Sequence, residues 1–176
     1  MRLVVVNRPG VGAIARAEAA GVAVRVLPHE QHPSREAYDD VLVAALREAG
    51  VEIVALAGFM RLLTARLLWA FPGRVLNIHP SLLPAFPGLH AQRQALEYGV
   101  KVSGCTVHFV DEGLDRGPIV LQSAVPVLDE DDEAALAARI LAEEHRIYPQ
   151  AVRLLAEGRL VTRGRRVIVQ KDSGAA

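Results

Sequence analysis

The chain has 176 residues, of which 51% are hydrophobic, and its twenty basic side chains balance twenty acidic ones. This length suits a single domain over residues 1–176 with a substantial core. The neutral balance gives no support for nucleic acid or a membrane surface as the main partner. The sequence contains no apolar run of membrane-spanning length and no signal peptide, so a cytoplasmic location is the default expectation.

The N-terminal part predicts a strand, a helix and a second strand. Residues 3–6 form a short, continuously apolar run, as expected of a strand covered on both faces. Residues 11–20 are a helix candidate that Gly21 would cap, and residues 22–27 are the next strand. A βαβ unit of this length predicts an α/β protein with a parallel sheet.

The next segment is predicted to be a loop followed by a helix. His29 and His32 lie in the loop, but no further ligands converge on them, so solvated histidines are favoured over a metal site. Ser34 is expected to cap the helix, which ends at Gly50. Arg35 falls in the first turn, where an ordinary surface arginine is the simplest interpretation.

Strands and helices continue to alternate through the middle of the chain. Residues 51–57 are the strongest strand candidate, and residues 65–70 and 90–98 are predicted helices. Residues 102–110 and 118–127 are predicted strands. The acidic, glycine-containing loop between these two strands needs no function as a simple hairpin connection.

Cys105 is the only cysteine of the chain. An intrachain disulfide and a cysteine zinc site are therefore excluded. Its strand-like surroundings favour a packed core thiol over a nucleophile.

The C-terminal part predicts a long helix and an edge hairpin or arm. The helix follows the acidic run at 129–133, reaches Tyr148, is interrupted at Pro149 and then resumes. Glu144 lies on its apolar face, where an unpartnered carboxylate is unfavourable. A surface acid and a ligand-facing acid are equally compatible with this position. Residues 160–176 are expected to form the hairpin or arm.

The segment that carries chemistry spans residues 77–90, Asn-Ile-His-Pro-Ser-Leu-Leu-Pro-Ala-Phe-Pro-Gly-Leu-His. It follows an apolar strand that should end at Asn77, because Pro80 cannot donate to a sheet ladder. Asn77 and His79 are two residues apart, so they point to the same side of an extended chain. A carboxamide donor beside an imidazole suits acyl transfer, although a strand end with a core histidine is an equal alternative.

Residues 77–90 resemble the signature of the folate-dependent formyltransferases. The resemblance extends from about Val4 to about Leu160 and includes residues 57–63 and 107–115. Several spaced motifs in one order make the likeness specific. It implies an open, mostly parallel Rossmann-like sheet with helices on both faces.

The resemblance also implies a reaction of purine synthesis. A formyl group would pass from 10-formyltetrahydrofolate, the co-substrate, to the amine of glycinamide ribonucleotide without a metal. Asn77 would donate to the formyl oxygen, and His79 would stabilise the developing charge as imidazolium and pass protons. Asp115 would be the carboxylate partner of His79, and we expect the three residues to converge in one cleft.

The family pattern further assigns ligand contacts. The folate would be bound by Arg35, Met60, Arg61, Leu62, Leu63, Asn77, Asp111, Glu112, Gly113, Leu114 and Asp115. The nucleotide would be contacted by Gly58, Pro80 and Glu144, with Glu144 at the ribose. Without the resemblance, helix packing is the simpler interpretation of residues 59–63.

The family opens with a strand, a glycine-rich phosphate loop and a helix that have no counterpart before residues 3–6. The sheet is therefore expected to lack its first βα unit. The missing strand would lie in the sheet between the strands at residues 3–6 and 51–57, and the residues that would bind the phosphate stay unassigned. One alternative is another 10-formyltetrahydrofolate enzyme, of the deformylase or tRNA formyltransferase type. Another is a truncated, non-catalytic folate-binding protein, and a homo-oligomer is compatible with each reading.

Overall fold

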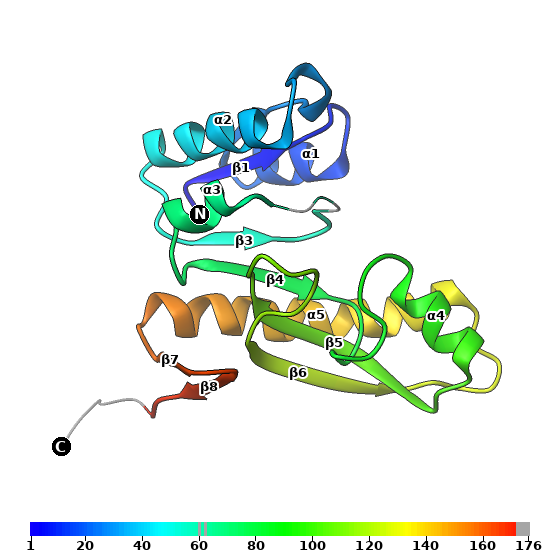
Figure 1. The fold of residues 1–176 in the computed structure, drawn as a ribbon. Coiled ribbons are helices and arrows are strands. Elements are labelled where there is room, and N and C mark those ends of the chain that lie inside the picture. The colour runs from blue at the N-terminus through cyan, green and yellow to red at the C-terminus, as the bar shows by residue number, and fades with distance from the viewer. Residues whose placement is uncertain (60, 62, 172–176) are drawn as a thin grey trace. The chain divides into compact units, whose positions relative to one another are not determined.

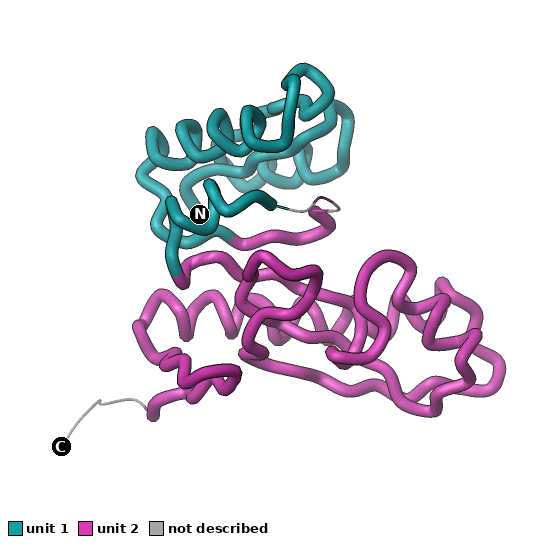
Figure 2. Tube along the Cα trace, in the orientation of Figure 1, with its two compact units in different colours: residues 1–54, 62–72 teal, residues 55–61, 73–176 magenta. Residues whose placement is uncertain are grey.

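The computed structural model describes residues 1–59, 61 and 63–171. It divides into two compact units, which Figure 2 shows in different colours. Unit 1 contains residues 1–54 and 62–72, and unit 2 contains residues 55–61 and 73–176. The single domain expected from the sequence remains a prediction.

Unit 1 begins with the predicted βαβ unit. Strand β1 (Leu3–Val6) leads through helix α1 (Gly12–Ala19) to strand β2 (Ala23–Val26). The two strands pair in parallel, which confirms the predicted direction. A short 3-10 helix, η1 (His29–Gln31), follows β2.

Two further helices complete unit 1. Helix α2 (Arg35–Glu48) is capped by Ser34, whose Oγ accepts a hydrogen bond from the backbone N–H of Ala37 at 3.1 Å, as predicted. Helix α3 (Ala65–Ala70) begins after Thr64. The Asp39 carboxylate is buried, and its Oδ2 accepts hydrogen bonds from the backbone N–H and the hydroxyl of Thr64, each at 2.7 Å. These bonds fix the start of α3 against α2.

The larger sheet has six strands in the order β3-β4-β5-β6-β8-β7 (Figure 1). Its strands are β3 (Val54–Leu56), β4 (Val75–His79), β5 (Val102–Phe109), β6 (Ile119–Pro126), β7 (Leu160–Arg163) and β8 (Arg166–Val169). Strand β3 crosses the boundary of the units at its first residue. The pairs β4–β5, β5–β6 and β7–β8 are antiparallel, and β6–β8 is parallel.

Helices α4 (Ala91–Tyr98) and α5 (Glu133–Ala156) belong to unit 2. Helix α5 packs against β5 and β6 and buries Leu136, Ile140 and Ile147. Its N-terminus is capped by Asp132, whose Oδ1 accepts from the backbone N–H of Ala135 at 2.7 Å. The acidic run therefore caps a helix, as predicted.

Three predicted boundaries were wrong, and the first is that of the strand expected at residues 51–57, because β3 spans only Val54–Leu56. Strand β4 does not end at Asn77 but continues to His79, because its ladder with β5 extends through the pair His79–Thr106. Helix α5 is not interrupted at Pro149. The exposed proline removes one N–H, while Ile147 and Ala151 on either side keep the helix packed through their buried side chains.

The α/β class and the open sheet are confirmed, and residues 160–169 form the expected edge hairpin. Among the described strands, β1 pairs with β2 and with no other strand. None of the described helices combines the length and apolar composition that a membrane-spanning segment needs.

Candidate active site

The antiparallel pair β4–β5 supplies the frame of the candidate site. Its register places Asn77 opposite His108 and His79 opposite Thr106. Side chains two residues apart on a strand share a face, and directly paired residues of neighbouring strands share it too. The pairing therefore gathers these four polar side chains on one face of the sheet.

His108 is fixed as a neutral acceptor for Asn77. Its Nδ1 lies 2.8 Å from the carbonyl oxygen of Phe109, which can only accept, so Nδ1 carries the proton. Its Nε2 is then free to accept from the side-chain amide of Asn77 at 3.2 Å. The imidazole is buried, and burial lowers the pKa of His108 because it disfavours the charged form.

His79 lies between a carbonyl and a carboxylate. Its Nε2 donates to the carbonyl oxygen of Phe86 at 2.8 Å, and its Nδ1 lies 3.4 Å from Oδ2 of Asp115. Asp115 also reaches toward His108, with 3.7 Å between its Oδ1 and the Nε2 of that ring. The side chains of His79 and Asp115 are only 6% and 10% exposed, so water screens their interaction little.

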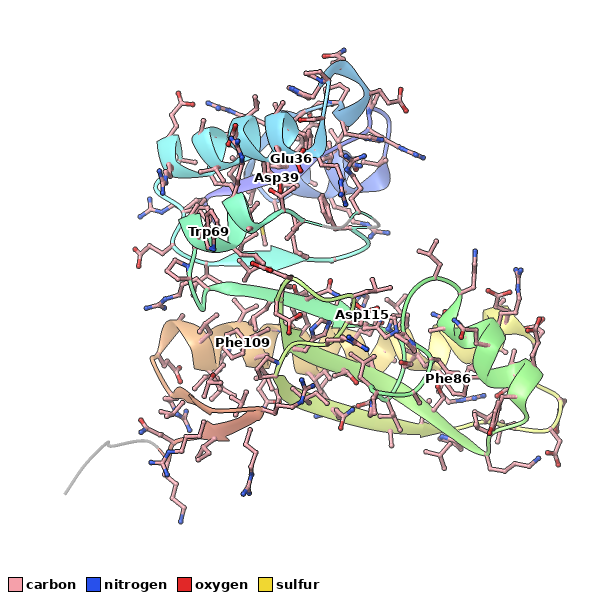
Figure 3. All side chains as sticks on the ribbon, in the orientation of Figure 1. Glu36, Asp39, Trp69, Phe86, Phe109 and Asp115 are labelled. Carbon is pink, nitrogen blue, oxygen red and sulfur yellow. The ribbon has the colours of Figure 1, made fainter. Side chains whose placement is uncertain are left out.

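The backbone places Asp115 by an unusual conformation. Its φ is +51°, in the left-handed region that aspartate tolerates better than most residues, at a cost of roughly 1–3 kcal/mol. Its Oδ2 accepts from the backbone N–H of Gly88 at 2.8 Å, which links the loop after β5 to the loop after β4 (Figure 3). Gly117 lets this loop close, because a Cβ there would lie 1.7 Å from the carbonyl oxygen of Phe109.

A second polar group holds the loop after β4. The hydroxyl of Thr106 donates to the carbonyl of Ser81 at 2.7 Å and accepts from the backbone N–H of Leu83 at 3.0 Å. The side chain of Gln122 bonds both this hydroxyl and the carbonyl of Leu83, each at 2.9 Å. Each such bond contributes about 1 kcal/mol, so the segment that follows His79 is held at several points.

The cluster of Asn77, His79, His108 and Asp115 combines an amide donor with a proton carrier. One N–H of the Asn77 amide is used on His108, and an amide nitrogen has a second N–H that can donate to a ligand. On His79, Nε2 is committed to Phe86, whereas the longer contact at Nδ1 leaves that nitrogen able to gain and lose a proton. This arrangement can stabilise an oxyanion and move a proton beside it.

A sequence profile described as formyl transferase matches residues 1–152. The chain belongs to the formyl transferase family. It is 45% identical over 160 residues to phosphoribosylglycinamide formyltransferase of Escherichia coli strain K12, covering 91% of this chain and 76% of that protein. A solved structure of glycinamide ribonucleotide transformylase 1 from Symbiobacterium toebii has a TM-score of 0.96 and 57% identity, covering 97% of this chain and 81% of that chain.

A third relative of this chain is a longer protein. The chain is 52% identical over 156 residues to the trifunctional purine biosynthetic protein adenosine-3 of Drosophila melanogaster. The match covers 89% of this chain but 12% of that protein. The chain therefore spans about an eighth of the length of this trifunctional relative.

The other residues predicted to contact ligands lie in different parts of the chain. Arg35 and Leu63 belong to unit 1, whereas Gly58 and Arg61 belong to unit 2. Met60 and Leu62 lie outside the described residues. The remaining residues are exposed or half-buried and directly precede Asp115 in the loop between β5 and β6: Asp111, Glu112, Gly113 and Leu114.

Glu144 is half-buried on α5, and Pro80 directly follows β4. Within the described part of the chain, no hydrogen bond satisfies the Glu144 carboxylate, and burial raises its pKa. Both alternatives for Glu144, a surface acid and a ligand-facing acid, stay predictions. Among the described residues, no group of three or more His, Cys, Asp or Glu is arranged to hold a metal ion.

The sequence prediction did not assign a role to His108 or Thr106. Both lie in the motif at residues 107–115 or directly before it, and both occupy alternate positions of a predicted strand. That alternation indicates a shared face, but it cannot show which residue of β4 lies opposite. The candidate site therefore contains a bond, from Asn77 to His108, that depends on the strand register.

Proposed function

We propose that this chain transfers the formyl group of 10-formyltetrahydrofolate to the amine of glycinamide ribonucleotide. The observation that supports the proposal best is the buried cluster of Asn77, His79, His108 and Asp115 in a chain of this family. The names of the relatives in Escherichia coli and Symbiobacterium toebii describe this same activity.

Asn77 is proposed to stabilise the charge that develops on the formyl oxygen. When the amine attacks the formyl carbon, a C–N bond forms and the carbonyl electron pair moves onto oxygen. The second N–H of the Asn77 amide would donate to this oxyanion, since His108 already orients the amide. The donor is thus held in place before the reaction begins.

His79 is proposed to act as the proton carrier. The attacking amine must lose a proton, and N10 of the folate must gain one when its bond to the formyl carbon breaks. Nδ1 of His79 would hold this proton next to the Asp115 carboxylate, while Nε2 keeps its bond to Phe86. Atoms and charge balance without a further reactant, because the proton lost by the amine is the one that the folate gains.

The ligand contacts follow the family pattern and remain part of the proposal. The folate would be contacted by Arg35, Met60, Arg61, Leu62, Leu63, Asn77, Asp111, Glu112, Gly113, Leu114 and Asp115. Gly58 and Pro80 would contact the nucleotide, and the half-buried carboxylate of Glu144 would accept from its ribose hydroxyls. A cytoplasmic location and small-molecule partners accompany this proposal.

The decisive experiment compares two histidine variants in a steady-state assay of formyl transfer. We expect His79→Ala to lower kcat about 100-fold or more, the usual range for loss of a general acid or base. His90→Asn is the matched control, because His90 is exposed and has a φ of +58°, which asparagine tolerates. Near-normal turnover of His79→Ala would refute the assignment.

The same assay separates transfer to the nucleotide from release of formate to water. With 10-formyltetrahydrofolate and glycinamide ribonucleotide together, we expect formylated nucleotide as the product. Formate released at the same rate with and without the nucleotide would indicate a deformylase instead. Saturable binding of a folate analogue without turnover of either kind would indicate a non-catalytic folate-binding protein.

A further inference from the structure

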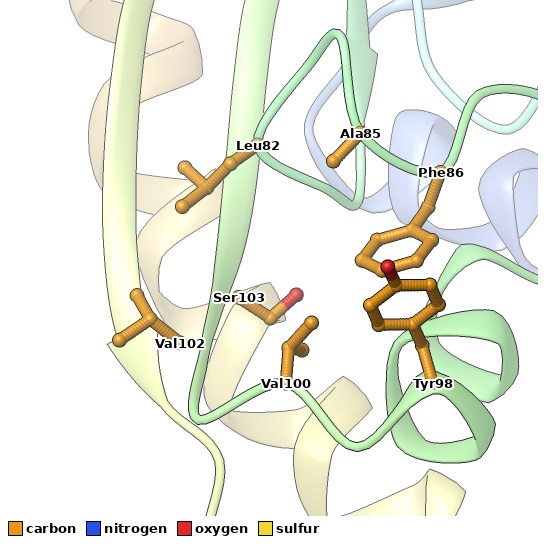
Figure 4. Close-up of a pocket in the computed structure, with 7 residues that line it drawn as sticks. All are labelled: Leu82, Ala85, Phe86, Tyr98, Val100, Val102 and Ser103. Atoms are coloured by element: carbon orange, nitrogen blue, oxygen red, sulfur yellow. The ribbon is translucent and has the colours of Figure 1, made fainter.

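Unit 2 contains a cavity of about 370 Å³ that the proposed reaction does not use. Figure 4 shows the side chains around it, which come from the loop after β4, from the end of α4 and from the start of β5. They are Leu82, Ala85, Phe86, Tyr98, Val100, Val102 and Ser103. The volume is at the lower end of the range of small-molecule sites, about 300–1,000 Å³.

Ser103 gives this cavity a buried hydroxyl, in addition to the exposed hydroxyl of Tyr98. Ser103 is only 2% exposed, and its Oγ has no hydrogen-bond partner among the described residues. In Figure 4 the Ser103 hydroxyl points into the space between the lining side chains, which is open to solvent where Tyr98 and Val102 are exposed. Buried hydroxyls are normally satisfied, so an unpartnered one aimed into a cavity indicates where a ligand atom would bind.

The rest of the lining defines the chemistry of the occupant. The rings of Phe86 and Tyr98 stand edge to face, with centroids 5.8 Å apart and planes at 65°. No charged side chain lines the cavity, and the nearby ammonium of Lys101 is paired with Asp129. Aromatic walls favour a flat ring, and an uncompensated charge would be unfavourable among apolar groups.

We propose that this cavity binds a small, uncharged, planar ring compound whose one hydrogen-bonding group contacts Oγ of Ser103. The occupant is neither substrate of the formyl transfer, because the charged phosphate and the folate glutamate find no cationic partner in this lining. The site adjoins the catalytic cluster through Phe86, whose ring lines the cavity while its carbonyl accepts from His79 at 2.8 Å.

The test is a binding titration of the whole chain with three matched indoles, and heteronuclear NMR detects the binding. Indole-3-carboxamide carries the ring and a neutral hydrogen-bonding group, indole-3-carboxylate adds a charge, and 3-methylindole lacks the polar group. We expect saturable binding of the carboxamide, with the largest backbone shifts at residues 82–86 and 98–103. The carboxylate should bind at least tenfold more weakly than the carboxamide.

Two substitutions connect this binding to the cavity. Ser103→Ala should raise the Kd of the carboxamide about tenfold, the ratio expected for one lost hydrogen bond, and leave the Kd of 3-methylindole unchanged. Ala85→Leu should fill the cavity and abolish binding of both. The matched control is Ser123→Ala, because the Ser123 hydroxyl is already bonded to Glu143 and does not line the cavity.

Three results would overturn the proposal. They are absence of saturable carboxamide binding, an equal Kd for Ser103→Ala and the unchanged chain, or equal affinity for the carboxylate. Circular dichroism of each variant shows whether it is folded, and Ser103→Ala removes too little volume to prevent folding by itself. The readout is binding without turnover, so it stands apart from the assay of formyl transfer.

Discussion

The two faces of β5 show opposite chemistry at equal burial. On one face, Thr106 and His108 are buried, and each of their side-chain polar atoms has a hydrogen-bond partner. On the other face, Cys105 and Val107 are fully buried, and helix α5 covers the strand. Burial alone therefore does not make a site reactive, because hydrogen-bond partners decide which side chains can move protons.

The pKa shifts of Cys105 and His108 reinforce this contrast between the two faces of β5. Burial, together with the nearby carboxylates of Glu144 and Glu143, raises the pKa of the Cys105 thiol to about 12. Burial also lowers the pKa of His108. Both shifts favour the neutral form. A neutral thiol is inert, whereas a neutral imidazole is the acceptor that Asn77 requires.

The largest expected effect concerns the face of β5 that carries Cys105. A rise of the Cys105 pKa from 9.0 to about 12 lowers the thiolate fraction near neutral pH about 1000-fold. We expect the folded chain to react with a disulfide reagent at pH 8 at least 1000-fold more slowly than the chain in urea. Absorbance of the released thiolate measures both rates. Rapid modification of the folded chain would show that this face is accessible.

The next effect concerns Asp115, whose carboxylate lies beside His79 and His108. Asp115→Asn keeps an acceptor for Gly88 and suits the φ of +51°, but it removes the charge beside His79. We expect kcat of formyl transfer to fall about 100-fold with little change in melting temperature. The matched control is Asp129→Asn, since that carboxylate is exposed and pairs with Lys101. Equal loss in both variants would argue against a specific role for Asp115.

A smaller effect tests whether His108 positions Asn77. His108→Phe removes the acceptor at 3.2 Å and should lower kcat roughly tenfold, the rate equivalent of one hydrogen bond. His108→Gln restores a neutral acceptor and should recover most of this loss, with KM for the folate nearly constant in both. A structural role alone would instead lower the melting temperature of both variants without this difference in kcat.

The smallest effect concerns Glu144, because burial raises the pKa of its carboxyl above the ordinary value for glutamate. Stability from a group with a raised pKa is complete below its unfolded pKa and is lost as pH rises through its folded pKa. Glu144→Gln should therefore raise the melting temperature at pH 7 by about 1–3 °C and have no such effect at pH 4. Calorimetry at both pH values measures this, and a lower melting temperature at pH 7 would contradict it.

Local patterns in the sequence determined much of the fold and part of the site. Ser34 and Asp132 cap their helices as their positions predict, and the period of a strand puts Asn77 and His79 on one face. These features depend on residues only a few positions apart. The motif also identified Asp115, although only through resemblance to a family.

Tertiary structure decided the rest of the site. The bond from Asn77 to His108 requires the register of two strands, and the approach of Asp115 requires a left-handed residue whose carboxylate is held by Gly88. Packing on both sides of Pro149 likewise overrode its local tendency to break a helix. Register, loop closure and burial depend on contacts between residues distant in sequence, so local periodicity cannot specify them.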